Sequence, residues 1–222
     1  MSRPALEVAL AKWLAAGRRG FGQISIAEEK DKAFSLIHWE DAARHDLVAY
    51  TQAEEAAEIA RFDDAGKYRP LKTAPNLRHG WKLTVADLAE LRLALDFLYP
   101  GRLAAFLAWE NGTLETTALR QTLGRQTGMY RSAATIRDED ADTLVGNFCR
   151  SDGGCLRTIL WKRDQGGTIA STQLPAQKFD PTFDQAGGDR PVIPLLCQET
   201  CNLLVAEARR IVKSENGAPA TP

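Results

Sequence analysis

The chain has 222 residues, which is long enough to bury a hydrophobic core without disulfide support. Its 28 Lys and Arg residues nearly balance 29 Asp and Glu residues, giving a formal net charge of -1. Neither nucleic acid nor a membrane is therefore expected as a partner, since no global charge attracts an anionic surface and no apolar run approaches the roughly 18 residues of a membrane span.

The first 83 residues predict a small α+β domain that braces the remainder of the chain. An amphipathic helix is expected over about 4–17, and its apolar pattern contains Glu7 and Lys12, which a secretory signal peptide would not carry. The expected location is therefore the cytoplasm, where thiols stay reduced. Cysteines in that compartment favour metal ligation or free thiols over disulfides.

Strand and turn signals follow this helix. Segments at about 21–27 and 33–39 predict a hairpin across the charged turn between them. A helix is expected over about 51–62, with Thr51 as its N-cap. The stretch 63–83 mixes Gly and Pro with aromatic and basic residues, so it is expected to form loops with one or two short strands.

From residue 84 the pattern becomes mainly helical and predicts a second domain over 84–215. Apolar spacing, caps and breakers predict helices that begin at Thr84, near residue 102, near residue 116 and near residue 138. A strand is expected within 156–162, and 216–222 is expected to be a disordered tail. The predicted fold class is α+β, with a small α+β domain followed by a mainly helical cysteine-containing domain.

Three histidines, His38, His45 and His79, lie in the N-terminal half without the spacing of a metal-ligand pair. We expect His38 to be a structural residue of a strand and the other two to lie in loops or at edges. No acid–base or nucleophile constellation stands out in the sequence, so an enzyme acting alone is not expected.

Four cysteines in two local pairs are the main functional clue. Cys149 and Cys155 flank a turn that contains two glycines, and Cys197 and Cys201 stand four residues apart. A helix is expected over 194–213, which would place Cys197 and Cys201 on one face with about 5–6 Å between their Cβ atoms.

Thiolates select zinc or iron–sulfur clusters, and both take four ligands from about two local pairs. The C-x3-C pair fits structural zinc, whereas the wider C-x5-C pair suits a bulkier cluster. From the residues alone a cluster, a zinc ion and cysteines without a metal all remain open. Several arginines stand near the cysteines and could offset the charge of an anionic centre or receive a partner's carboxylates: Arg120, Arg125, Arg131, Arg150, Arg157, Arg209 and Arg210.

Four runs of residues carry a family resemblance: RQTGMYR at 125–131, CRSDGGCLR at 149–157, ILW at 159–161 and PLLCQETCN at 194–202. These four motifs resemble those of the 4Fe-4S cluster-binding domain attached to CbiX-type sirohydrochlorin chelatase-like proteins, where a small stabilising domain precedes it. The resemblance covers about 84–213 by specific motifs and 1–83 only by position and general pattern.

The resemblance implies that Cys149, Cys155, Cys197 and Cys201 ligate one 4Fe-4S cluster. It implies electron transfer or redox sensing, in support of tetrapyrrole or cobalamin metabolism, with a separate sirohydrochlorin-type chelatase or another redox protein as partner. No chelatase domain is evident in this sequence, so chelatase activity is not expected. The alternative is a structural zinc module, held by the same four cysteines, that acts as an interaction protein.

Overall fold

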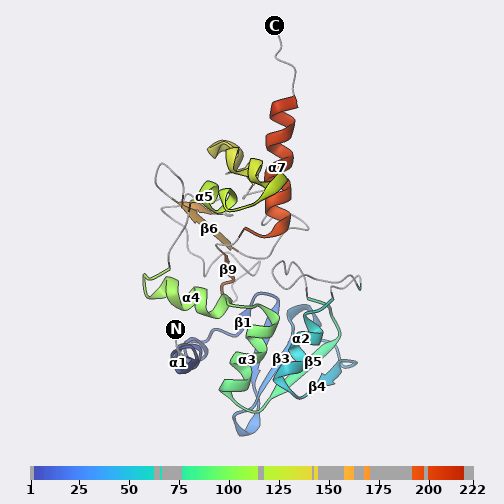
Figure 1. The fold of residues 1–222 in the computed structure, drawn as a ribbon. Helices are drawn as coiled ribbons and strands as arrows, with labels where there is room; N and C mark the ends of the chain where they lie inside the picture. The colour runs from blue at the N-terminus through green and yellow to red at the C-terminus, as the bar shows by residue number, and fades with distance from the viewer. Residues whose placement is uncertain are drawn as a thin grey trace. The chain divides into compact units, whose positions relative to one another are not determined.

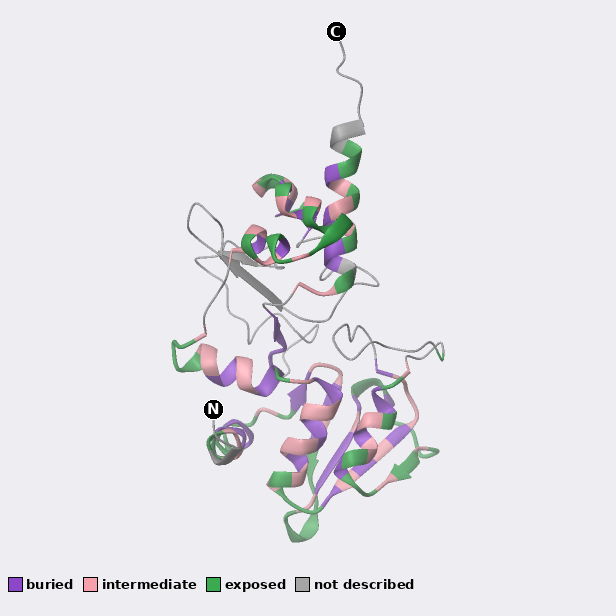
Figure 2. Ribbon diagram, in the orientation of Figure 1, coloured by how far each residue is buried: buried purple, intermediate pink, exposed green. Residues whose placement is uncertain are grey.

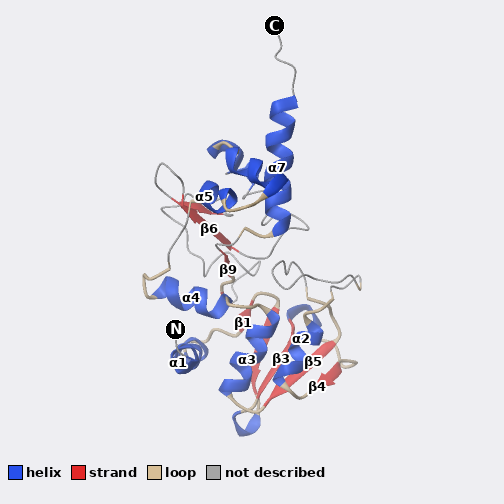
Figure 3. Cartoon of the chain, in the orientation of Figure 1, coloured by secondary structure: helices blue, strands red, loops and turns tan. Residues whose placement is uncertain are grey.

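The computed structural model describes residues 3–62, 66, 77–114, 118–141, 143–144, 158–162, 168–170, 192–197 and 200–217. Its mixture of helices and strands confirms the α+β class (Figures 1 and 3). The chain forms two compact units, Met1–Leu114 with Asp180–Leu196, and Glu115–Phe179 with Cys197–Pro222. The sequence-based boundary at residue 84 was drawn where helical patterns begin, whereas the first unit continues to Leu114.

A six-stranded sheet, in the order β4-β5-β3-β2-β1-β8, forms the centre of the first unit. Its strands are β1 (Gly20–Phe21), β2 (Ile24–Glu28), β3 (Phe34–His38), β4 (Val48–Tyr50), β5 (Trp81–Val85) and β8 (Val192–Ile193). The predicted hairpin is confirmed, because β2 and β3 pair antiparallel with Ile26 opposite Leu36. Strand β5 pairs antiparallel with β3 on its other side, with Ile37 opposite Lys82.

The described residues of the first unit also form four helices and three short 3-10 turns. They are α1 (Arg3–Ala15), α2 (Ala56–Ile59), α3 (Leu88–Leu98) and α4 (Arg102–Glu110), with turns η1 (Lys30–Lys32), η2 (Trp39–Asp41) and η3 (Ala53–Glu55). Helix α3 lies over the sheet in Figure 1 and also packs against α1 and α2. These contacts explain why a helix that looks like the start of a helical domain belongs with the sheet.

Two predicted helix starts were wrong by a few residues. Thr84 lies in strand β5, and the N-cap of α3 is Asp87, whose carboxylate accepts hydrogen bonds from the backbone N–H groups of Ala89 and Glu90. The helix expected to begin after Thr51 begins one residue later, at η3, where Gln52 is the N-cap and forms a capping box with Glu55. In the first case the pairing of β5 with β3 extends the strand over the residue that would otherwise have capped the helix.

The core of the first unit follows the alternation of its strands (Figure 2). Trp81, Leu83 and Val85 are buried along β5, while the residues between them are only partly buried. The turn between β1 and β2 depends on Gly22, which has φ +59°. A Cβ atom there would lie 2.6 Å from the side chain of Leu195, so the turn requires glycine.

The second unit is described in part. Its elements are α5 (Leu119–Gly124), η4 (Gly128–Thr135), β6 (Thr158–Lys162), β7 (Thr168–Ala170) and α7 (Asn202–Gly217), and β9 (Leu196–Cys197) joins β6 and β7 in a three-stranded sheet. Residues 138–141 and 143–144 are helical, as expected near residue 138. Within the described ranges, no helix has the length and apolar character needed to cross a membrane.

Candidate functional site

Two of the four predicted ligands, Cys197 and Cys201, lie in the segment that leads into the last helix. Cys197 ends strand β9 and Cys201 immediately precedes α7. Cys149 and Cys155 lie outside the described residues, as does the turn between them. The convergence of the four cysteines therefore stays a prediction.

The expected helix over 194–213 was wrong in its first turns, because α7 begins only at Asn202. Residues 192–193 pair with β1 and residues 196–197 form β9, so sheet hydrogen bonds replace helical ones in this segment. Cys197 and Cys201 consequently do not share a helix face. Cys197 comes from a strand, and Cys201 is the residue that directly precedes helix α7.

Cys201 occupies the N-cap position of α7. Its sulfur accepts a hydrogen bond from the backbone N–H of Leu204 at 3.4 Å, and its carbonyl accepts from the N–H of Val205 at 3.0 Å. A helix N-terminus carries partial positive charge and favours an anionic group, including a thiolate. The local fold therefore suits a sulfur that ligates a metal in its deprotonated form.

Cys197 is buried, with 5% of its surface exposed, in the apolar core of the second unit. The other buried members of this core are Leu119, Leu123, Ala133, Ile136, Ala141, Leu144, Leu204, Val205, Ala208 and Val212. Cys201 packs against the same core and is partly exposed. An inorganic centre bound by these two sulfurs would be shielded from water on the side of Cys197.

The RQTGMYR motif contributes the 3-10 turn η4, which packs against α7. Met129 and Tyr130 are 62% and 44% exposed. The guanidinium of Arg209, from α7, lies 5.5 Å from the centre of the Tyr130 ring. This cation–π contact links α7 to η4.

Two other arginines near the cysteines form ion pairs. Arg120 lies 3.1 Å from the carboxylate of Asp138. Arg210 donates to both carboxylate oxygens of Glu207, and this hydrogen bond lowers the pKa of that carboxyl. Arg125 and Arg131 are exposed.

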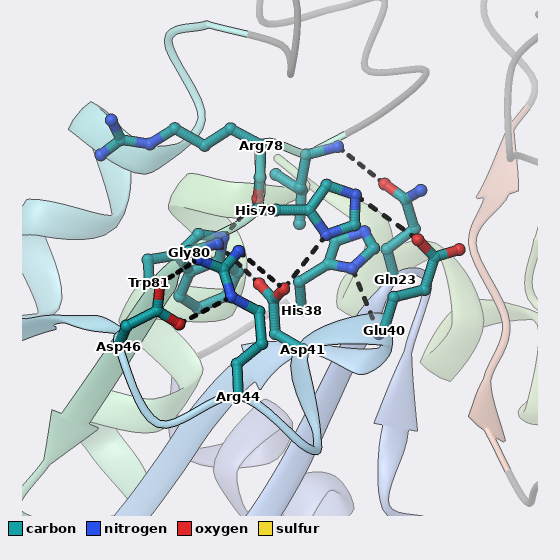
Figure 4. Close-up of polar contacts among 11 residues, drawn as sticks. Gln23, His38, Glu40, Asp41, Arg44, Asp46, Arg78, His79, Gly80 and Trp81 are labelled. Atoms are coloured by element: carbon teal, nitrogen blue, oxygen red, sulfur yellow. Dashed lines mark hydrogen bonds and ion pairs between the residues drawn. The ribbon is translucent and has the colours of Figure 1, made fainter.

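A second polar cluster lies in the first unit, where the sequence predicted no metal-binding pair (Figure 4). One ligand atom each from His38, Asp41 and His79 lie within 4.8 Å of one another. His38 ends β3, and His79 lies just before β5. Because β3 and β5 are antiparallel, the end of β3 lies beside the start of β5. The spacing of the two histidines in the sequence does not reveal this strand pairing, so the cluster could not be predicted from it.

Comparison with known proteins finds a similar domain family for each half of the chain. Residues 7–110 match the model of the DR2241 stabilising domain, and residues 111–210 match that of a 4Fe-4S iron-sulfur cluster binding domain. The chain thus resembles a DR2241 stabilising domain followed by a 4Fe-4S iron-sulfur cluster binding domain. No match was found among curated protein sequences.

The crystal structure of DR2241 from Deinococcus radiodurans resembles this chain with a TM-score of 0.70 and 25% sequence identity. The match covers 96% of this chain and 42% of DR2241. That protein is described as a multi-domain protein with structural similarity to chelatases and with two additional novel domains. This chain therefore spans less than half of the length of DR2241.

The described part of the second domain fits an iron–sulfur cluster. Its donors include a buried sulfur from Cys197 and a second sulfur, that of Cys201, that accepts a backbone N–H at a helix N-terminus. Soft thiolates and N–H donors to sulfur are the features that such clusters use.

Proposed function

We propose that this protein binds one 4Fe-4S cluster through Cys149, Cys155, Cys197 and Cys201 and serves in electron transfer or redox sensing. The match of residues 111–210 to a 4Fe-4S domain carries the proposal. A cluster of this kind supplies a one-electron redox centre. The cytoplasm is the proposed location, since a reducing compartment keeps thiols able to ligate.

The protein's own residues give the centre two different environments. The N–H of Leu204 donates to the sulfur of Cys201, and hydrogen bonds to ligand sulfurs raise a cluster's reduction potential. Burial of Cys197 excludes water, which lowers the local dielectric around its sulfur. The chain's own residues therefore hold the redox centre and tune its reduction potential.

We further propose that the redox partner is a separate protein, a sirohydrochlorin-type chelatase or another electron carrier, in tetrapyrrole or cobalamin metabolism. The likeness of DR2241 to chelatases supports this pathway. The exposed guanidinium groups of Arg125 and Arg131 support a partner or substrate that carries carboxylates.

Anaerobic purification followed by iron, acid-labile sulfide and zinc analysis tests the cluster. We expect iron and sulfide in equal amounts, visible absorption that bleaches with dithionite, and loss of both in the Cys201→Ser variant. The matched control is Ser214→Ala, which changes an exposed hydroxyl farther along α7. One zinc ion per chain in a colourless protein would contradict the cluster and favour the alternative of a structural zinc module.

Mixing the cluster-loaded protein with a sirohydrochlorin-type chelatase tests the partner. We expect the two proteins to form a complex whose dissociation constant rises when Arg131→Gln removes an exposed charge. Absence of a complex would remove the chelatase as the partner.

A further inference from the structure

The polar cluster of the first unit combines three side chains that bind transition metals. Two imidazoles and one carboxylate, from His38, His79 and Asp41, place their ligand atoms within 4.8 Å of one another. His79 Nδ1 lies 3.4 Å from Asp41 Oδ1. Two ligand atoms bound to one tetrahedral zinc ion at about 2.0–2.1 Å stand roughly 3.3–3.4 Å apart, so this pair is already at a suitable distance.

The cluster is held by the ends of two paired strands. His38 and Asp41 are fully or almost fully buried, whereas the side chain of His79 is 30% exposed. The rings of His38 and His79 lie with centres 3.9 Å apart. Solvent therefore reaches the cluster past His79, while the other two ligands are fixed by the core.

Hydrogen bonds outside the three ligands orient them. Asp41 Oδ2 accepts the backbone N–H of Gly80 at 2.6 Å, which fixes the carboxylate. His38 Nδ1 accepts the N–H of Glu40 at 3.3 Å, a contact longer than the usual 2.9–3.0 Å. A metal ion that took this nitrogen would replace this long hydrogen bond.

One cation already lies beside Asp41, and its charge is shared with another carboxylate. Arg44 Nη1 is 3.3 Å from Asp41 Oδ1, while Arg44 also contacts both oxygens of Asp46, at 3.0 and 2.9 Å. The hydrogen bond from Arg44 lowers the pKa of Asp46, which keeps that carboxylate charged. Asp46 thus neutralises the positive charge of the Arg44 guanidinium. The negative charge of the Asp41 carboxylate can then be balanced by a second cation.

Glu40 adds a further carboxylate on the exposed side. Its Oε2 lies 3.5 Å from His79 Nε2 (Figure 4). Two histidines with one carboxylate form the ligand set of several zinc and iron(II) sites, with the remaining positions open to water or another ligand. The chemistry of the cluster matches a borderline transition metal better than calcium or magnesium, which take oxygen ligands.

We propose that His38, Asp41 and His79 bind a divalent transition metal ion such as zinc, separate from the cysteine-bound cluster. This inference goes beyond the proposed redox function and involves none of the cysteines. The ion would fasten the end of β3 to the segment that leads into β5.

The test measures zinc binding by equilibrium dialysis on untagged, cluster-loaded protein. We expect one zinc ion per chain in the wild type and at least about a hundredfold weaker binding in His79→Ala. The matched control is His45→Ala, because His45 is the chain's remaining histidine and is exposed. Asp41→Asn is a second variant, since its amide oxygen can still accept the N–H of Gly80, and it should also lose the ion.

X-ray absorption at the zinc edge separates this site from the cysteines. We expect the zinc to have only nitrogen and oxygen ligands, at about 2.0–2.1 Å. The amount of zinc bound per chain should be unchanged in Cys201→Ser. Absence of bound zinc, binding that His79→Ala leaves unchanged, or sulfur ligands at about 2.3 Å would each overturn the proposal. Iron and sulfide content, measured on the same samples, reports separately on the 4Fe-4S cluster.

Discussion

Replacing Arg102 by methionine tests how the first domain holds the segment that leads to Cys197. Arg102 is 5% exposed, and its Nη1 donates to the carbonyl of Leu196 at 2.8 Å. Its Nε donates to the carbonyl of Pro100 at 3.0 Å. Since Leu196 directly precedes Cys197, this buried guanidinium fixes the backbone beside a predicted ligand.

The expected cost follows from those two hydrogen bonds. Methionine keeps much of the apolar stem but leaves the buried carbonyl of Leu196 without its charged donor. A hydrogen bond to a charged group contributes about 1.5–3 kcal/mol, so we expect Arg102→Met to lower the free energy of unfolding by about 2–4 kcal/mol. For a chain of this size that corresponds to a fall in Tm of roughly 4–16 °C.

Urea unfolding followed by tryptophan fluorescence is a suitable assay. Four of the five tryptophans, Trp13, Trp39, Trp81 and Trp109, belong to the first unit and report its unfolding. Arg61→Met is the control, because Arg61 forms an exposed ion pair with Glu58 whose loss should cost under about 0.5 kcal/mol. Equal midpoints for Arg102→Met and Arg61→Met would refute the assigned role of Arg102.

Three further changes have definite expected outcomes. Asp87→Ala removes the N-cap of α3 and should cost about 1 kcal/mol in thermal unfolding, most of which Asp87→Ser recovers; equal Tm values for the two would contradict the capping role. Leu204→Ala, at a fully buried position, should cost about 2–5 kcal/mol and release iron during gel filtration, while exposed Lys213→Ala retains it. Glu207→Gln should cost about 0.3–0.5 kcal/mol at pH 7. Arg210 lowers the pKa of Glu207 in the folded state, so the stability difference between wild type and variant is fully present above the unfolded-state pKa of this carboxyl. It should vanish as the pH falls through the lowered folded-state pKa. A difference in Tm that stays constant with pH would contradict the ion pair.

The sequence predicted elements well where one local pattern decides them. The hairpin of β2 and β3 and helix α4 were confirmed because alternation, turns and helix stops lie within a few residues of each other. The strand predicted within 156–162 was confirmed as β6. The start of α7 was predicted wrongly, because the strand pairing of residues 192–197 depends on partners far away in the chain.

The cysteine site and the His38–Asp41–His79 cluster also differ in whether a local sequence pattern reveals them. The cysteines could be found from the sequence because they form local pairs with recognisable motifs. His38 and His79 are 41 positions apart and meet only through the register of β3 and β5, which places Ile37 opposite Lys82. Their grouping with Asp41 therefore required the structure.

The central claim is that the protein holds an iron–sulfur cluster on its four cysteines. The most direct measurement is iron, acid-labile sulfide and zinc per chain in anaerobically purified wild type and in four single Cys→Ser variants. We expect four irons and four sulfides per chain in the wild type, and a loss of both in each variant at Cys149, Cys155, Cys197 and Cys201. Full iron and sulfide content after any one of these substitutions, or a wild-type protein without labile sulfide, would contradict it.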